Sequence, residues 1–167
     1  MRHIIGILLQ NESGALSRVA GLFSSRGYNI ESLSVSATDD PALSRITLVT
    51  KGSEAVVQQI VNQLNRLIDV VAVDDMTGED HLERELALIK LRVRPSQRDS
   101  VRALVERAGG RVVTESSDCH VVEVTSSEAE ITALTQSLAT QAELLEIVRS
   151  GALAMARQER ILHVVES

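Results

Sequence analysis

The sequence predicts an α+β fold made of two consecutive βαββαβ units, and three observations support this prediction. Short apolar runs of strand length alternate with amphipathic stretches of helix length. The order of these elements in the first half of the chain recurs in the second half. The 167 residues, of which 44% are hydrophobic, are enough for two small domains with their own cores.

The first half begins with a buried strand and a helix. Residues 3–9 (HIIGILL) form a nearly continuous apolar run, which is typical of a buried strand. A helix is expected over residues 14–26, because apolar residues recur there at helical spacing and Gly27 can end it. Asn11 and Ser13 in the preceding turn are good N-cap residues, since a side-chain oxygen can accept a hydrogen bond from a free backbone N–H.

Two strands, a second helix and a last strand complete the first unit. Residues 28–37 and 44–51 are expected to be strands, and residues 70–73 are expected to be the fourth. A helix that begins after Gly52 and Ser53 carries an apolar stripe of Val57, Ile60, Val61, Leu64 and Leu67. A sheet covered on one side by two helices is a two-layer arrangement of the ferredoxin-like type.

The second half repeats this order with a more diverged sequence. Its strands are expected over residues 85–93, 111–115, 120–125 and 144–148. Its first helix begins near Pro95, where Ser96 and Asp99 have the spacing of a capping box. Its second helix begins at Ser127, which forms the same pattern with Glu130.

The polar segment of residues 77–80 separates the two halves. We therefore expect an N-terminal domain over residues 1–77 and a second domain over residues 78–167. The tail of residues 151–167 belongs to the second domain in this prediction. A short helix is expected in it, and its ILHVV run is expected to dock on that domain.

Composition and charge exclude several classes of function. The net charge is −6 and the aromatic content is 1%, so nucleic acid is not an expected partner. Cys119 is the only cysteine, which excludes a disulfide within the chain and fits a reducing compartment. The N-terminal apolar run is too short for a signal peptide, and no run approaches membrane-spanning length. We therefore expect a cytoplasmic protein with no membrane partner.

No catalytic or metal-binding constellation is predicted. The four histidines, His3, His81, His120 and His163, are scattered and show no metal-ligand spacing. A Walker loop, a dinucleotide-binding glycine motif and a nucleophile elbow are all missing from the sequence. A cluster of arginines, Arg92, Arg94, Arg98 and Arg102, suits either an anionic partner or ordinary pairing with nearby acids.

The turn before the first helix, together with the start of the next strand, is the best candidate site. A helix that opens from a glycine-containing turn presents unpaired N–H groups and the positive end of its dipole, which suits a carboxylate. Asparagine amides both donate and accept, so they suit an ammonium as well as a carboxylate. The candidate residues are Asn11, Gly14, Ala15, Leu16, Asn29 and Ile30. Together they suit a free amino acid, and the alternative is a capped turn without a ligand.

Two segments carry a resemblance to a known family. NESGALSRVAGLFSSRGYNIESLSV and DDPALSRITLVT resemble the start of the regulatory (small) subunit of acetohydroxyacid synthase, also called acetolactate synthase. The resemblance implies an N-terminal ACT domain followed by a second ferredoxin-like domain, and no catalysis by this chain itself. It implies that the chain binds and activates the catalytic (large) subunit and confers feedback inhibition by valine. Thiamine diphosphate, magnesium and FAD would then belong to the catalytic subunit and not to this chain.

The resemblance also implies a homodimer formed through the ACT domain. Valine would lie between the first turn of one chain, at Asn11, Gly14, Ala15 and Leu16, and the second strand of its partner, at Asn29 and Ile30. The alternative function is a free-standing ACT-type amino-acid sensor that acts on another enzyme or regulator.

Overall fold

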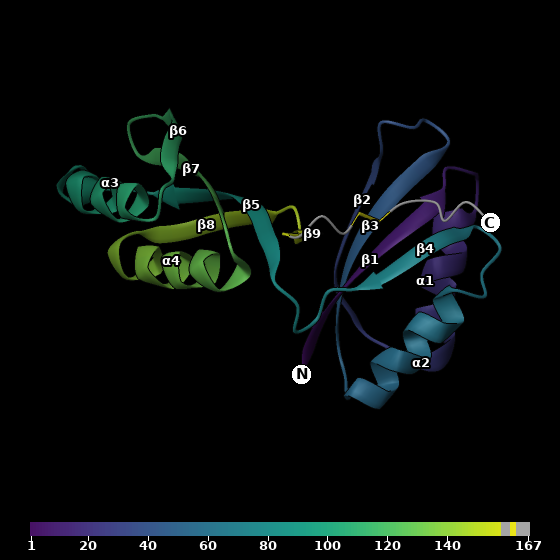
Figure 1. Cartoon of the computed structure of the whole chain (residues 1–167). Helices are drawn as coiled ribbons and strands as arrows, with labels where there is room; N and C mark the ends of the chain where they lie inside the picture. The colour runs from purple at the N-terminus through teal and green to yellow at the C-terminus, as the bar shows by residue number, and fades with distance from the viewer. Residues whose placement is uncertain (158–160, 163–167) are drawn as a thin grey trace. The chain divides into compact units, whose positions relative to one another are not determined.

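The structure is a computed structural model that describes residues 1–157 and 161–162. The chain divides into two compact units, which are described separately below. Unit 1 comprises Met1–Leu82 and the segment that begins at Ala152, and unit 2 comprises Glu83–Gly151. In Figure 1, each unit is a sheet with two helices packed against it.

Unit 1 has the predicted βαββαβ order. Its elements are β1 (Arg2–Gln10), α1 (Ala15–Arg26), β2 (Ile30–Ala37), β3 (Leu43–Lys51), α2 (Glu54–Leu64) and β4 (Val70–Asp75). The strands form an antiparallel sheet in the order β2-β3-β1-β4, so β2 and β4 are its edges. This topology confirms the ferredoxin-like fold for the first half of the chain.

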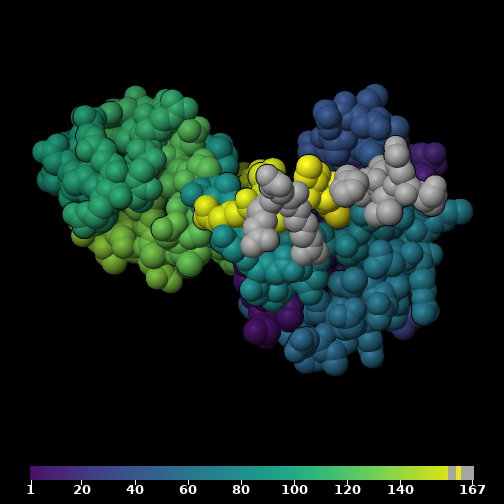
Figure 2. Space-filling view, viewed as in Figure 1, coloured from purple at the N-terminus to yellow at the C-terminus, as the bar shows by residue number. Residues whose placement is uncertain are grey.

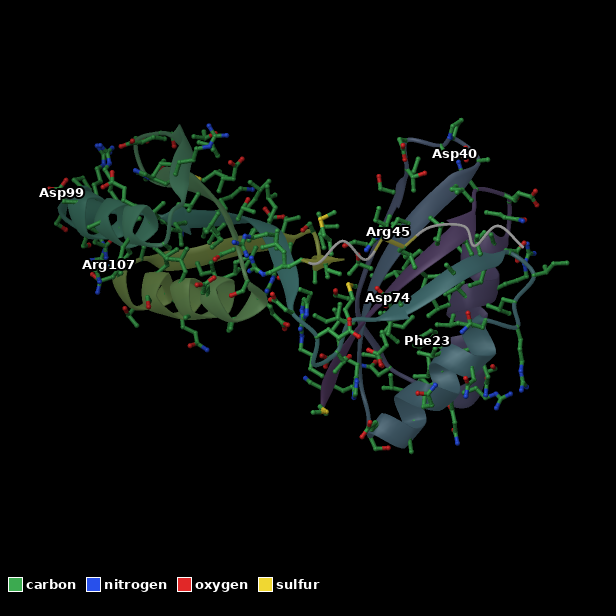
Figure 3. The ribbon with its side chains drawn as sticks, viewed as in Figure 1. Phe23, Asp40, Arg45, Asp74, Asp99 and Arg107 are labelled. Carbon is green, nitrogen blue, oxygen red and sulfur yellow. The ribbon has the colours of Figure 1, made fainter. Side chains whose placement is uncertain are left out.

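The core of unit 1 lies between the helices and one face of the sheet. Strand alternation directs Ile5, Ile7 and Leu9 of β1 into this core. Phe23 of α1 is buried there with its ring edge against Tyr28, at a centroid distance of 6.2 Å (Figure 3). The remaining core residues are aliphatic, and burying one large apolar side chain stabilises a fold by about 1.5–3 kcal/mol.

Unit 2 repeats the topology of unit 1. Its elements are β5 (His81–Arg92, which begins in unit 1), the short 3₁₀ helix η1 (Pro95–Gln97), α3 (Arg98–Arg107), β6 (Arg111–Glu115), β7 (Cys119–Ser126), α4 (Glu128–Gln141) and β8 (Glu143–Arg149). The strands pair antiparallel in the order β6-β7-β5-β8. The second ferredoxin-like arrangement confirms the tandem repeat that the sequence predicts.

The start of α4 agrees with the sequence. The Ser127 hydroxyl accepts a hydrogen bond from the Glu130 N–H, and the Glu130 carboxylate accepts one from the Ser127 N–H at 3.1 Å. This is the predicted capping box, which satisfies two backbone donors that have no partner inside the helix.

The starts of α1 and α3 differ from the sequence prediction. Neither Asn11 nor Ser13 caps α1, because the N-cap is Gly14, whose φ of 85° brings the chain into the helix without a side-chain cap. The predicted pairing of Ser96 with Asp99 is also wrong. Residues 95–97 form a 3₁₀ turn, in which Gln97 Oε1 accepts from the Arg94 N–H at 2.9 Å.

The C-terminal tail forms a strand, β9 (Leu153–Ala156), where a short helix was predicted. Ala152 and Ala154 are buried, whereas Leu153 and Met155 are exposed, and this alternation belongs to a strand. We had predicted that the tail belongs to the second domain. Its described residues from Ala152 onward belong instead to unit 1. Residues 163–165 of the ILHVV run lie outside the described residues.

Ala152 and Ala154 pack with Ile4, Val49 and Met76. Ile4 and Val49 alternate with residues that face the helices, so this cluster lies on the opposite face of the sheet. The Arg45 guanidinium donates to the Ala154 carbonyl at 3.0 Å and thereby ties the tail to β3. The small alanine side chains allow this close approach.

Candidate functional site

The structure divides the six predicted site residues into two groups. Asn11, Gly14, Ala15 and Leu16 lie between β1 and the first turn of α1, at the end of the sheet where Gln10 pairs with Leu43. Asn29 and Ile30 lie at the start of β2, where Ile30 pairs with Thr50. The rise from Leu43 to Thr50 along β3 is roughly 24 Å at about 3.4 Å per residue. One chain therefore does not bring the two groups together.

The group at the start of α1 presents free backbone donors. Among the described residues, the N–H groups of Gly14, Leu16 and Ser17 have no hydrogen-bond acceptor. These groups and the helix dipole favour an anion at this position. The N–H of Ala15 donates to the Glu12 carbonyl at 3.2 Å, so Ala15 contributes its buried methyl group and not a free backbone donor.

Arg18 adds a cation to this turn that was not predicted from the sequence. Its Nε and Nη2 atoms both donate to the carboxylate of Asp69, and the Nη2 bond is 2.7 Å long. The third nitrogen, Nη1, lies only 3.1 Å from the position that a Cβ on Gly14 would take. The guanidinium is thus held in place by Asp69 and faces the turn.

The pair of Arg18 and Asp69 stays charged. Hydrogen bonds from Arg18 hold the pKa of the Asp69 carboxyl below its usual value, although its burial opposes this. The hydrogen bond to Asp69 likewise raises the pKa of Arg18. The four-residue spacing of Gly14 and Arg18 places them on one helix face and could have indicated Arg18. No local pattern links Asp69 to the turn, because the pair is separated by 51 positions in the sequence.

Asn11 fixes the position of the turn. Its side-chain Nδ2 donates to the Pro41 carbonyl at 3.0 Å, and its backbone N–H donates to the Ala42 carbonyl at 2.7 Å. Both acceptors belong to the loop between β2 and β3, which carries Asp40 at its tip in Figure 3 and stands out in dark blue in Figure 2. The Asn11 Oδ1 atom remains available as an acceptor, for example for an ammonium group.

Asn29 and Ile30 offer one polar and one apolar group at the other end of the sheet. The Asn29 carbonyl accepts from the Thr50 hydroxyl at 2.6 Å, which fixes the backbone there. Its side-chain amide is exposed and has no hydrogen-bond partner within the described part of the chain. Ile30 is half-buried and packs against the edge of the core.

Three arginines of the predicted cluster, Arg92, Arg98 and Arg102, have structural partners. Arg92 pairs with Glu143 at 2.8 Å, Arg102 pairs with Glu115 at 3.2 Å, and Arg98 donates to a backbone carbonyl. No group of three or more His, Cys, Asp or Glu side chains in residues 1–157 and 161–162 could hold a metal ion. Over the same residues, none of the helices has the length and apolar character needed to cross a membrane.

Comparisons with known proteins cover nearly the whole chain. Residues 5–72 match the family described as the AHAS small subunit-like ACT domain, and residues 84–158 match the family described as the small subunit of acetolactate synthase. The chain is 42% identical over 162 residues to the acetolactate synthase isozyme 3 small subunit of Escherichia coli, which covers 97% of this chain and 99% of that protein. It is 41% identical over 157 residues to a probable acetolactate synthase small subunit of Archaeoglobus fulgidus, covering 94% and 98% of the two chains.

A solved structure has the same fold. The crystal structure of the acetolactate synthase small subunit from Thermotoga maritima matches with a TM-score of 0.86 at 32% sequence identity. The match covers 96% of this chain and 99% of that chain. Both halves of the chain, and not the first half alone, are therefore shared with these proteins.

Proposed function

This chain belongs to the family of acetolactate synthase small subunits, regulatory subunits with an ACT domain, and we propose that it activates a catalytic subunit of this enzyme and makes it sensitive to valine. In this proposal the chain has no catalytic site of its own. Thiamine diphosphate, magnesium and FAD are held by the catalytic subunit, and the complex works in the cytoplasm.

The turn at Gly14 is the single observation that carries the valine proposal. It combines three free N–H groups with the Nη1 atom of Arg18, and no side chain at Gly14 occupies the space in front of them. A carboxylate at this point gains hydrogen bonds from the backbone and a charge partner. The exposed Leu16 supplies apolar surface for an aliphatic side chain, and Asn11 supplies an acceptor for the ammonium group.

The strand topology supports a site shared by two chains. β1 and β2 both run antiparallel to β3, so they point the same way and Ile30 lies at the end of the sheet remote from Gly14. β2 is an edge strand, and an unpaired edge is available to a second copy. An antiparallel pair of β2 strands would bring Asn29 and Ile30 of the second copy to the end where Gly14 lies. Val35, a β2 residue that is 41% exposed, would be covered by the same pairing.

Regulation then follows from linkage between two binding equilibria. Valine that contacts two chains stabilises one arrangement of the dimer over others, and a catalytic subunit bound to the dimer responds to that change. The usual coupling free energy between two allosteric sites is roughly 1–3 kcal/mol. An effect of valine of about five- to 150-fold on the affinity between the chain and the catalytic subunit is therefore the expected range.

The direct test is reconstitution with the purified catalytic subunit of the same organism. Acetolactate formation from pyruvate is measured for the catalytic subunit alone, for this chain alone and for the mixture. We expect activity to rise on mixing and to fall when valine is added, and we expect no activity from this chain alone. No stimulation and no co-elution in size-exclusion chromatography would instead support a free-standing amino-acid sensor with another target.

A further inference from the structure

We propose that the groove between α1 and α2 is a docking surface for an acidic segment of the catalytic subunit. This inference rests on the proposed function, because it assigns the place where the partner binds. The groove is defined by Arg18, Leu22 and Arg26 of α1 and by Gln63, Arg66 and Leu67 at the end of α2. Its volume is about 390 Å³, and it is open to solvent.

The groove concentrates the positive charge of an acidic unit. Residues 1–82 contain six Lys and Arg against ten Asp and Glu, and three of those six cations, Arg18, Arg26 and Arg66, line this one groove. None of the described residues that line it is acidic. The acids that act on it from outside are Asp69, which is bonded to Arg18, and Glu12, which is near Arg18.

Two of the three arginines have no side-chain partner among the residues that the structure describes. Among the described residues, no carboxylate, carbonyl or hydroxyl accepts a hydrogen bond from the side chains of Arg26 or Arg66. By contrast, Arg92, Arg102 and Arg111 of unit 2 each pair with a glutamate within 3.2 Å. Within the described part of unit 1, the groove therefore holds two arginines whose positive charge has no acidic partner.

The floor of the groove is apolar. Leu22 and Leu67 are half-buried at the margin of the core, and the adjacent Ile68 is 87% exposed. A surface with apolar contacts at its centre and arginines around it is typical of protein interfaces, in which arginine is enriched. The complementary partner is a peptide segment that carries carboxylates beside an apolar side chain.

Arg18 connects this groove to the proposed valine site. Its Nη1 atom faces the Gly14 turn, and the rest of its side chain lines the groove. A carboxylate of the catalytic subunit in the groove and the carboxylate of valine at the turn would thus both act on the same guanidinium. This shared residue gives a short physical route between the effector and the catalytic subunit.

The experiment reverses the two unpaired charges in the full-length chain. The variant is Arg26→Glu with Arg66→Glu, and Arg18 is left intact because it also faces the valine site. Its half-maximal concentration for stimulating the purified catalytic subunit is expected to rise at least about tenfold. Raising NaCl from about 50 to about 300 mM should weaken the wild-type interaction more than that of the variant.

The matched control is Arg94→Glu with Arg107→Glu in unit 2. Arg107 lies in the last turn of α3 as Arg26 does in α1. Arg107→Glu and Arg26→Glu therefore each place a negative charge at a helix C-terminus. Thermal melting and valine titration of each variant establish that it is folded. Unchanged stimulation by the groove variant, or an equal loss in the control, would overturn the groove assignment. A wild-type chain that fails to stimulate would instead refute the proposed function itself.

Discussion

At the residue scale, Gly14 joins the local conformation of the chain to its proposed function. Its φ of 85° lies in the left-handed region that favours glycine, and a Cβ there would come within 3.1 Å of Arg18 Nη1. The glycine was predictable from the sequence, because it opens a helix after a polar turn. The partners that make the turn electropositive were not, because the ion pair of Arg18 and Asp69 forms only when α1 packs beside the chain after α2.

Gly14→Asp should lower the affinity of the chain for valine by more than about tenfold. The new carboxylate would lie beside Arg18 and occupy the place where the carboxylate of valine is bound. Gly78→Asp is the matched control, since Gly78 also has a positive φ of 76° and open space around it. Isothermal titration with valine measures both variants, and an unchanged affinity of Gly14→Asp would place the ligand elsewhere.

Asn11→Ala and Asn29→His should weaken valine binding less, by about two- to tenfold, because each removes one side-chain hydrogen bond to the ligand. Asn11→Ala also removes the bond to the Pro41 carbonyl that fixes the turn. The same titration, with circular dichroism as a check on folding, measures the effect. If Asn29→His binds valine as tightly as the wild type, the second strand is not part of the site.

At the element scale, apolar runs and periodicity in the sequence indicated the four α-helices and the strands β1–β8. The prediction for the tail was wrong, because the tail forms a strand and not a helix. Four residues, Leu153–Ala156, are too few to separate a helix from a strand, and alanine is the best helix former. The conformation of the tail depends on its packing against Ile4, Val49 and Met76. No local pattern in the tail reveals this apolar surface.

Ala154→Asp should destabilise unit 1 by at least about 2 kcal/mol, because it places a charge in the cluster on the open face of the sheet. Met155→Asp is the neighbouring control and should change the free energy of unfolding by less than about 0.5 kcal/mol, since this side chain is 61% exposed. Urea denaturation followed by circular dichroism measures both. Equal effects would show that the tail does not pack on the sheet.

The capping box of α4 makes unit 2 sensitive to acid. Hydrogen bonds from Ser126 and Ser127 lower the pKa of Glu130 to about 2 from a usual value of 4.5. Because the pKa is lower in the folded state, the carboxylate stabilises the fold above about pH 4.5, and this contribution is lost as the pH falls toward 2.

The stability gap between the wild type and Glu130→Gln should therefore be largest near neutral pH and should close between about pH 4.5 and pH 2. Glu128→Gln removes a charge from the same turn and serves as the control. Thermal melts over this pH range provide the measurement. A gap that is the same at pH 7 and pH 2 would contradict the role of the charged carboxylate.

At the scale of the whole molecule, two copies of one topology carry different surfaces. The helices of unit 1 carry a groove with two arginines that have no partner among the described residues, whereas five of the nine Lys and Arg residues of unit 2 pair with glutamates. The tandem fold was predictable because the element order recurs in the sequence. The groove was not, because Arg18 and Arg26 of α1 are distant in sequence from Arg66, and the three line one groove only through the packing of α1 and α2.

The most direct test of the account is isothermal titration of the purified chain with valine, with leucine and isoleucine as controls, combined with sedimentation of the same sample. We expect a dimer that binds valine saturably, with equivalent sites related by the two-fold axis of the dimer. We expect this binding to be lost in Gly14→Asp but not in Gly78→Asp. A chain that sediments as a monomer of 18.1 kDa and still binds valine would contradict the shared site. Absence of valine binding both to the chain alone and to its complex with the catalytic subunit would contradict its proposed role as the valine sensor.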